Sequence, residues 1–422
     1  MNILQTKKGI NQRYNALLVR ETAAVQKAHL KKEFELAEAS RVAEAACALT
    51  AKALQTWEKT RGTRRLAPGE LLLEEGGQKI VLPFLNEKAL YQLKNGTGYR
   101  AVKRELELCQ FEQLKKANPE ATMEDLWHLV NQGELTLKRG GKDFLPEKRL
   151  DSEKVQVPGR KSFQGEIPPE ALEPAVKSLV DDWGLRPAQA EAMTSSAARI
   201  YTWCSPLISE LKPGQMVWLA HGTKKSRHTD PGLFQPVVLT LLSPEDKELP
   251  LATTADLKRL KTIQLERITT EAWKQDAVLT TLDLEWILQI SPAMLRGILE
   301  AYFEHFGIIL PTAGTVLDMG RTLTHKKIVV ELSLNGLSTQ EISRRIYHTP
   351  EAVDNYLRLF ERVLLLKYYR VPVSALPRVT GYSKSLLDEH LELVEKHFPT
   401  EEALADYLGQ RGIQLEKNST GK

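Results

Sequence analysis

The 422-residue sequence has few cysteines and no long apolar segment. Its three cysteines, Cys47, Cys109 and Cys204, are far apart and odd in number, which favours reduced thiols over disulfides or a metal site. No apolar run approaches the roughly 20 residues that a helix needs to cross a bilayer. The first residues, MNILQTKKGINQRYNALL, have no apolar core followed by a small-residue cleavage site, so we expect no signal peptide. These absences predict a cytoplasmic protein with no membrane partner.

The motifs of several enzyme classes are also missing. There is no P-loop, no dinucleotide-type glycine pattern after a strand, and no Cys/His spacing typical of a metal site. A nuclease or integrase needs about three carboxylates converging on two metal ions. The 54 Asp and Glu residues are plentiful, but no pattern singles out such a trio. We therefore expect no cofactor and no metal, assign no catalytic residue, and consider an enzyme less expected than a binding protein.

Length and composition predict several ordinary domains. A chain of 422 residues with 42% hydrophobic and 27% charged residues has material for two to four cores. The net charge of +4 is unevenly distributed, since residues 1–160 carry 28 Lys or Arg against 21 Asp or Glu, and residues 321–400 carry 12 against 9. A nucleic-acid surface is therefore expected in these two regions.

The stretch from Leu334 to Leu366 has the pattern of a helix-turn-helix. Ser338 and Glu341 have the spacing of a capping box, and Thr349 followed by Pro350 marks the start of a second helix. Apolar residues at helical spacing predict a small shared core between the two helices. The second helix of such a pair enters a major groove in DNA-binding proteins. Plain packing of a helical hairpin is the alternative interpretation.

Several polar residues of this stretch suit DNA contact. Asn355 and Arg358 lie on the exposed side of the second helix, and Arg344 and Arg345 on the first could position the phosphate backbone. The start of the second helix argues against DNA, because it carries two carboxylates that repel phosphates. The full set of predicted DNA-binding residues is Arg344, Arg345, Thr349, Asn355, Arg358, Arg296, Lys326, Lys327, Lys384, Lys138 and Arg139.

Two further helical pairs are predicted. Thr281 and Ser291 can cap helices over residues 282–288 and 292–303, where Arg296 is the only strong base of the second helix. After Leu366, residues 370–397 predict a third pair, in which Gly381 supplies the turn and Ser383 caps the second helix.

The N-terminal half contains a sequence echo. Residues 69–77 (GELLLEEGG) recur as residues 133–141 (GELTLKRGG), and each copy predicts a β-hairpin around Gly-Gly. The second copy has the basic tip Lys138-Arg139 and would suit the wing of a winged helix. Before them, residues 21–59 predict a long amphipathic helix that belongs to the core or forms a homo-oligomer. Residues 216–220 and 237–242 predict two buried strands.

Several motifs of the C-terminal half resemble a known family. PGQMVWLA (213–220), PVVLTL (236–241), PTAGTVLDMG (311–320), ISRRIYHTPEAVDNYLRLFERV (342–363) and VTGYSKSLLDEHLELVEKH (379–397) are similar to the uncharacterised prokaryotic domain-of-unknown-function family 1670. The resemblance covers roughly residues 170–400 and implies a β-containing middle followed by helix-turn-helix units with a DNA-binding role. Residues 336–357 are similar to LuxR-type regulators and sigma-factor region four, and residues 279–299 to DeoR-type repressors.

Together these features predict a multi-domain, mainly α protein with small β elements, of the α+β class. The expected divisions are a basic helical region with two β-hairpins (1–150), an α+β middle domain (165–255), a winged-helix-like first helix-turn-helix (256–320), two further helix-turn-helix units (321–400) and a tail (401–422). The expected function is sequence-specific binding of double-stranded DNA, as a transcriptional regulator or mobile-element accessory factor. The alternatives are a metal-dependent nuclease or integrase-like enzyme, and a scaffold that docks the transcription machinery.

Overall fold

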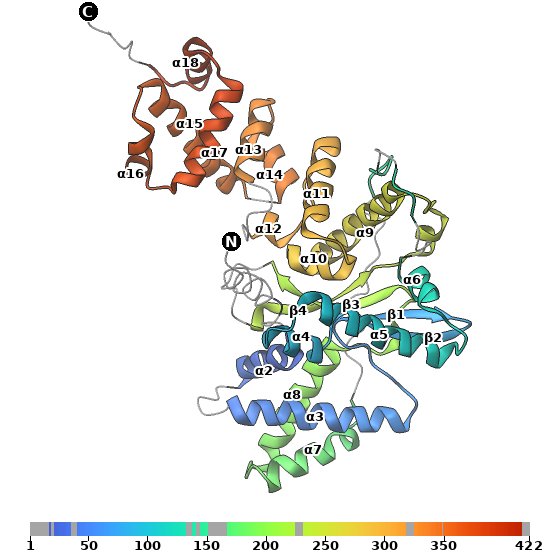
Figure 1. The fold of residues 1–422 in the computed structure, drawn as a ribbon. Helices are drawn as coiled ribbons and strands as arrows, with labels where there is room; N and C mark the ends of the chain where they lie inside the picture. Colours follow the sequence, from blue (N-terminus) through green and yellow to red (C-terminus); the bar gives the residue numbers. More distant parts are fainter. Residues whose placement is uncertain are drawn as a thin grey trace, which may run out of the picture. The chain divides into compact units, whose positions relative to one another are not determined.

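A computed structural model describes residues 17, 21–34, 40–131, 137–140, 144–150, 167–223, 231–317, 325–347 and 349–415. The chain divides into two compact units. Unit 1 comprises residues 1–305 and 310–313, and unit 2 comprises residues 306–309 and 314–422. The described residues are mainly helical with one small antiparallel sheet (Figure 1), which confirms the predicted α+β class. The finer divisions expected along the chain stay predictions.

The sheet lies in unit 1 and combines strands from distant parts of the chain. Its order is β2-β1-β3-β4, and β5 pairs with the end of β3. The strands are β1 (Glu70–Glu75), β2 (Gln78–Pro83), β3 (Gln215–Gly222), β4 (Phe234–Thr240) and β5 (Ala277–Val278). The first predicted hairpin is confirmed, because Gly76 and Gly77 both have positive φ (57° and 79°) and join β1 to β2. The two predicted buried strands are confirmed as β3 and β4.

The two hairpins are related by a local two-fold arrangement centred on the pair Leu71 and Met216. The N–H of Gly69 donates to the carbonyl of Val217 at 2.7 Å, and the N–H of Gly214 donates to the carbonyl of Leu72 at 2.7 Å. Each glycine follows a proline, has a φ near +90°, and accepts two N–H groups from the end of its own hairpin. Residues 68–85 and 213–242 are thus two copies of one structure.

The flanking helices repeat in the same order. α3 (Ser40–Thr60) precedes the first hairpin and α8 (Pro187–Cys204) the second, and the two helices pack on each other. α5 (Tyr99–Ala117) packs on β2, as α9 (Thr254–Lys274) packs on β4. Unit 1 therefore contains a repeated helix–hairpin–helix. Its other helices are α4 (Glu87–Lys94), α6 (Met123–Asn131), α7 (Pro169–Asp181), α10 (Thr281–Leu288) and α11 (Pro292–Phe306).

The prediction of one long helix over residues 21–59 is wrong. α2 (Thr22–Glu33) and α3 are separate helices that pack against each other and against α8. This arrangement lets both apolar faces enter one core, in which Val25 and Leu30 of α2 and Ala46 of α3 are buried together with Met193 of α8. A homo-oligomer formed through this region stays a prediction.

The predicted echo at residues 133–145 lies largely outside the described residues. Within it, Lys138 and Arg139 are exposed, and Lys138 forms an isolated parallel bridge with Thr253 just before α9.

The second helical pair is present as α10 and α11. The cap of α10 is Thr280 rather than the predicted Thr281, because its hydroxyl accepts the N–H of Asp283. Ser291 caps α11 as predicted.

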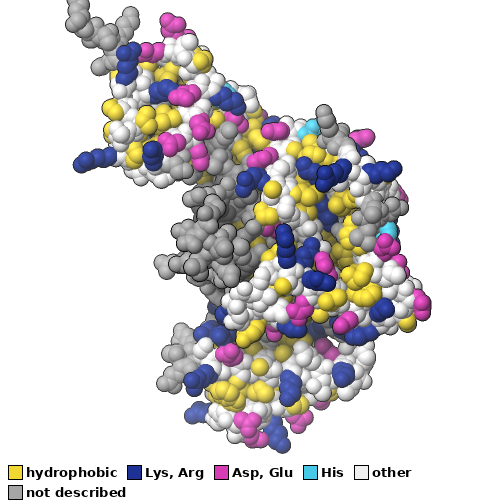
Figure 2. Space-filling model, viewed as in Figure 1, with side chains coloured by type: hydrophobic (Ala, Val, Ile, Leu, Met, Phe, Trp, Pro, Cys, Tyr) yellow, Lys and Arg dark blue, Asp and Glu magenta, His cyan; other side chains and the backbone are white. Residues whose placement is uncertain are grey.

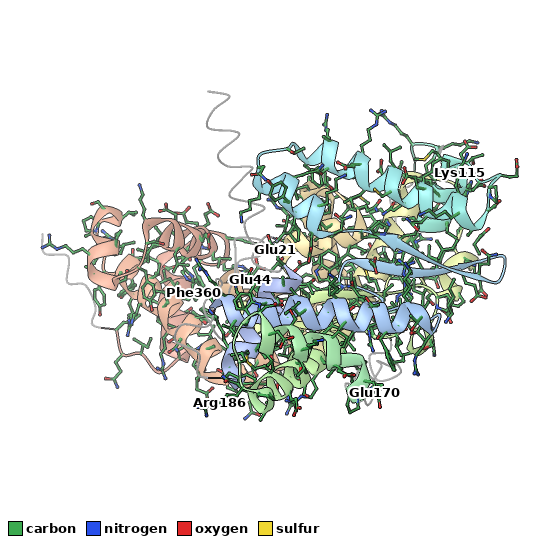
Figure 3. The ribbon with its side chains drawn as sticks, turned by 90° about the horizontal axis from the view of Figure 1, so that it is seen from below. Glu21, Glu44, Lys115, Glu170, Arg186 and Phe360 are labelled. Atoms are coloured by element: carbon green, nitrogen blue, oxygen red, sulfur yellow. The ribbon has the colours of Figure 1, made fainter. Side chains whose placement is uncertain are left out.

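Unit 2 is a cluster of helices around one buried aromatic side chain. Phe360 is fully buried and contacts the rings of His390 and Phe398; Figure 3 labels it among the surrounding helices. The helices are α12 (Ala313–Val316), α13 (His325–Leu334), α14 (Thr339–Ile346), α15 (Pro350–Tyr368), α16 (Leu376–Thr380), α17 (Lys384–His397) and α18 (Glu401–Gln410). Short 3₁₀ turns are Val373–Ala375 in unit 2 and Ile208–Glu210, Pro231–Leu233 and Pro244–Glu248 in unit 1. No helix in the described ranges is both long and apolar enough to cross a membrane.

Candidate nucleic-acid interface

α14 and α15 are positioned by the local signals that the sequence predicted. The Ser338 hydroxyl accepts the N–H of Glu341 at 3.3 Å, and the Glu341 carboxylate accepts the N–H of Ser338 at 2.9 Å. Backbone and hydroxyl hydrogen bonds from Ser338 hold the pKa of Glu341 below its ordinary value. The Thr349 hydroxyl accepts the N–H of Ala352 at 3.3 Å and starts α15. Both predicted caps are confirmed.

The turn between the two helices is short and tight. α14 ends at Ile346, Tyr347 takes a left-handed conformation (φ 59°), and α15 begins at Pro350. α13 packs against both helices. Ile342 and Ile346 of α14 and Val353 of α15 are fully buried, so the predicted shared core is present.

The exposed face of α15 carries a polar stripe. Glu351, Asn355, Arg358 and Arg362 are exposed and follow each other at steps of three or four residues, opposite the buried face of the helix. Arg362 was not among the predicted residues, although its position four residues after Arg358 was a sufficient signal. Arg344 and Arg345 are exposed in the last turn of α14.

The second acidic residue at the start of α15 has a structural role. The Asp354 carboxylate accepts a hydrogen bond from the Thr339 hydroxyl at 3.0 Å, which joins the start of α14 to the second turn of α15. Of the two carboxylates that argued against DNA, Glu351 is exposed and Asp354 is engaged with α14.

Ion pairing distinguishes two groups of basic residues in unit 2. Lys367, Arg370, Lys396 and Arg411 each pair with a carboxylate. Arg344, Arg345, Arg358 and Arg362 form no ion pair with any residue that the structure describes. On the face of unit 2 visible in Figure 2, basic and acidic side chains are interspersed.

The remaining predicted residues are distributed over both units. Lys384 is exposed at the start of α17 in unit 2. Lys326 and Lys327 belong to α13, and the structure does not describe their side chains. Arg296 is exposed on α11 and belongs to unit 1, as do Lys138 and Arg139. Arg344, Arg345, Asn355 and Arg358 are thus the predicted residues that lie on the packed pair α14 and α15.

Residues 191–393 match the model of a family described as "Protein of unknown function (DUF1670)". This match, which spans just under half of the chain, confirms the predicted resemblance to that family but supplies no activity. No curated protein and no solved structure matches the chain. The similarity to LuxR-type, sigma-factor and DeoR-type helices stays a prediction. Within the described ranges, no group of three or more His, Cys, Asp or Glu side chains is placed to hold a metal ion.

Proposed function

We propose that the protein binds double-stranded DNA through α14 and α15. The observation that supports this is the exposed stripe of Asn355, Arg358 and Arg362, next to Arg344 and Arg345 at the end of α14. Arginines that are exposed and form no ion pair within the described chain contribute little to folding, whereas each can replace a counterion on a phosphate. Asn and Arg also read base edges in the major groove.

The helical geometry is compatible with this role. The short helix α14 is followed by a turn of a few residues and the longer helix α15, and α13 packs against both. In helix-turn-helix proteins, the second helix of such a pair enters a major groove. The first turn of α15 would face the DNA with one carboxylate, Glu351. We therefore expect Arg344, Arg345 and the arginines of α15 to supply most of the phosphate contacts, and Asn355 to contribute to base selection.

The class of protein that we propose is a sequence-specific regulator or an accessory factor of a mobile element. The proposal is tested with the full-length protein and labelled random and genomic duplex DNA, in a salt series, with and without Mg²⁺. For wild-type protein we expect binding that weakens steeply with salt and leaves the DNA uncut. Cleavage in Mg²⁺ would instead support the enzyme, and absence of binding at low salt would support the protein-docking scaffold.

Charge removal then tests the location. Arg358→Ala/Arg362→Ala should lower the slope of log K against log salt by about two, because each phosphate contact contributes about 0.9. Arg344→Ala/Arg345→Ala should have a similar effect. The matched control is Arg370→Ala/Lys396→Ala, which removes the same charge from side chains that pair with Glu401 and Glu331. Equal slopes in all three variants and the wild type would contradict the placement on α14 and α15.

A further inference from the structure

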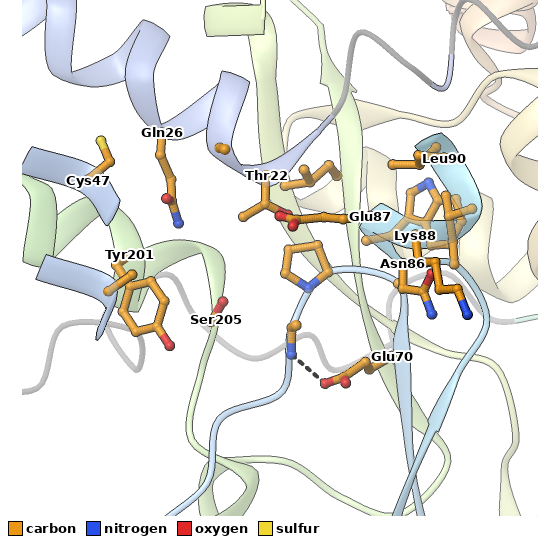
Figure 4. Close-up of a pocket in the computed structure, with 18 of the residues that line it drawn as sticks. Thr22, Gln26, Cys47, Glu70, Asn86, Glu87, Lys88, Leu90, Tyr201 and Ser205 are labelled. Carbon is orange, nitrogen blue, oxygen red and sulfur yellow. Dashed lines mark hydrogen bonds between the residues drawn. The ribbon is translucent and has the colours of Figure 1, made fainter. Parts of the chain in front are cut away.

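A cavity of about 670 Å³ lies within unit 1 and is lined by residues of that unit alone. It is bounded by α2, α3, α8, the start of β1 and the start of α4 (Figure 4). Much of its wall is apolar, with contributions from Ala51, Pro68, Leu85, Leu90, Trp218 and Leu219. Its volume is within the range of about 300–1,000 Å³ that small-molecule sites occupy.

One side-chain amide on the wall of this cavity has no partner among the described residues. Gln26 is 6% exposed, lines the cavity, and makes no hydrogen bond with any other residue that the structure describes. Figure 4 shows its side chain extending from α2 toward the space between Thr22 and Tyr201. A ligand that enters the cavity can therefore supply a hydrogen bond to this amide.

The charged groups of the cavity are mainly acidic. Glu70, Glu87 and Glu44 line it, against the single base Lys88. The Lys88 ammonium forms an ion pair with Glu105, and Glu44 pairs with Lys27 at 3.7 Å. Glu70 is the most enclosed carboxylate of the group, and burial raises its pKa above the ordinary value. The environment therefore favours a ligand with positive charge.

The internal repeat shows that the fold does not require the negative charge of Glu70. One carboxylate oxygen of Glu70 accepts the N–H of Ala67 at 2.8 Å and closes the turn before β1. In the second copy, Gln215 stands at the equivalent position after Pro213-Gly214 and accepts the N–H of Lys212 at 2.9 Å. A neutral amide thus forms the same turn, so the turn does not require the charge of Glu70. The Glu70 carboxylate also forms an ion pair with Arg64 at 3.9 Å, and the Arg64 side chain is largely exposed.

We propose that this cavity binds a small organic cation, whose apolar body packs between α3, α4 and β3 and whose protonated amine pairs with Glu70. Gln26 hydrogen-bonds a polar group of the same molecule on the opposite side of the cavity. The proposal concerns unit 1 alone and is independent of DNA binding.

The test uses the full-length protein and a panel of aryl-alkyl amines of about 12 to 25 heavy atoms, a size that suits the cavity. Each amine is compared with the alcohol and the carboxylate of the same body, starting with tryptamine, tryptophol and indole-3-propionate. Isothermal titration calorimetry and the shift of melting temperature are the measurements. We expect the amines to bind more tightly than both counterparts.

The decisive variant is Glu70→Gln, because Gln215 shows that an amide can close the turn. It should weaken amine binding about ten- to a hundredfold, as expected for the loss of a charge-assisted hydrogen bond. Glu74→Gln, an exposed position on the same strand, should leave binding unchanged. Ala51→Phe should abolish binding by filling the cavity; if that variant fails to fold, Glu70→Gln decides alone.

Three results would overturn the proposal. They are the absence of binding by every amine of the panel, equal binding of amine and alcohol, and unchanged amine affinity in Glu70→Gln.

Discussion

Gln275 binds the backbone of Val238 through both ends of its carboxamide. Its oxygen accepts the N–H of Val238 at 3.0 Å, and its nitrogen donates to the carbonyl of Val238 at 2.8 Å. One and two turns earlier on α9, Glu271 and Arg267 make the corresponding bonds to the N–H and carbonyl of Thr240, at 2.6 and 2.8 Å. Side chains of α9 thus satisfy the free edge of β4, which would otherwise be open to pairing with another chain.

We expect Gln275→Leu to lower the free energy of unfolding by about 2–4 kcal/mol, because two buried backbone groups lose their partners. Gln264 on the same helix provides a matched control. It is fully buried, and neither polar atom of its side chain has a hydrogen-bond partner in the described structure. Gln264→Leu should therefore leave stability unchanged or raise it. Urea denaturation measures both, and similar losses in the two variants would contradict this account of the strand edge.

Gly69 should tolerate no side chain. Its φ is +92°, and a Cβ atom would lie 2.2 Å from the carbonyl oxygen of Leu85. Gly69→Ala combines left-handed strain with a backbone clash, so we expect a loss of about 3 kcal/mol or more. The control is Gly62→Ala, where φ is +66° and the space is open; the cost there should be about 1 kcal/mol. Thermal unfolding compares the two, and equal shifts would exclude the close approach at Gly69.

Lys261 on α9 should make stability depend on pH. The pKa of its amine is lowered from 10.5 to about 8. Burial is the main cause, nearby Lys103 contributes in the same direction, and Asp246 opposes the shift. Between pH 8 and 10.5 the unfolded chain binds the proton that the folded chain has released, so this group adds stability as pH rises. Lys261→Met should therefore be more stable than wild type at pH 7, and the difference should shrink toward pH 10.5. A difference in melting temperature that stays constant over this range would contradict the prediction.

Glu351 should oppose the proposed binding of DNA. It is exposed in the first turn of α15, on the same stripe as Asn355 and Arg358. Removing a charge near a phosphate changes the energy by about 1 kcal/mol in water, so Glu351→Gln should tighten DNA binding roughly fivefold at low salt. Glu402→Gln, also an exposed first-turn carboxylate but on α18, should have no effect. Fluorescence anisotropy measures both, and an unchanged affinity in Glu351→Gln would place the DNA elsewhere.

The features that were predictable from the sequence depend on contacts between near neighbours in the chain. The Ser338–Glu341 capping box, the Thr349 cap and the Gly76-Gly77 turn each involve residues at most three positions apart. Their geometry follows from the types of those residues alone. The exposed positions of Asn355 and Arg358 followed from helical periodicity in the same way, and Arg362 follows by the same rule.

The internal repeat was only partly visible in the sequence. The amino-acid sequence of residues 69–77 is similar to that of residues 133–141. The hairpin that pairs with β1 and repeats its structure is a different segment, which begins at Pro213-Gly214. Its strands have different apolar residues and a longer connection, so the relationship is revealed by backbone geometry: the two reciprocal hydrogen bonds, and the positive φ of Gly69 and Gly214.

The sequence by itself determined where α11, α14 and α15 begin and where β1 turns into β2, because caps, turns and periodicity act over a few residues. Tertiary structure alone decided that α2 and α3 are separate helices, that α9 covers the edge of β4, and that Gln26 and Glu70 face one cavity. The physical reason is that burial and hydrogen bonding between such distant residues depend on the packing of the whole unit, which no local pattern encodes.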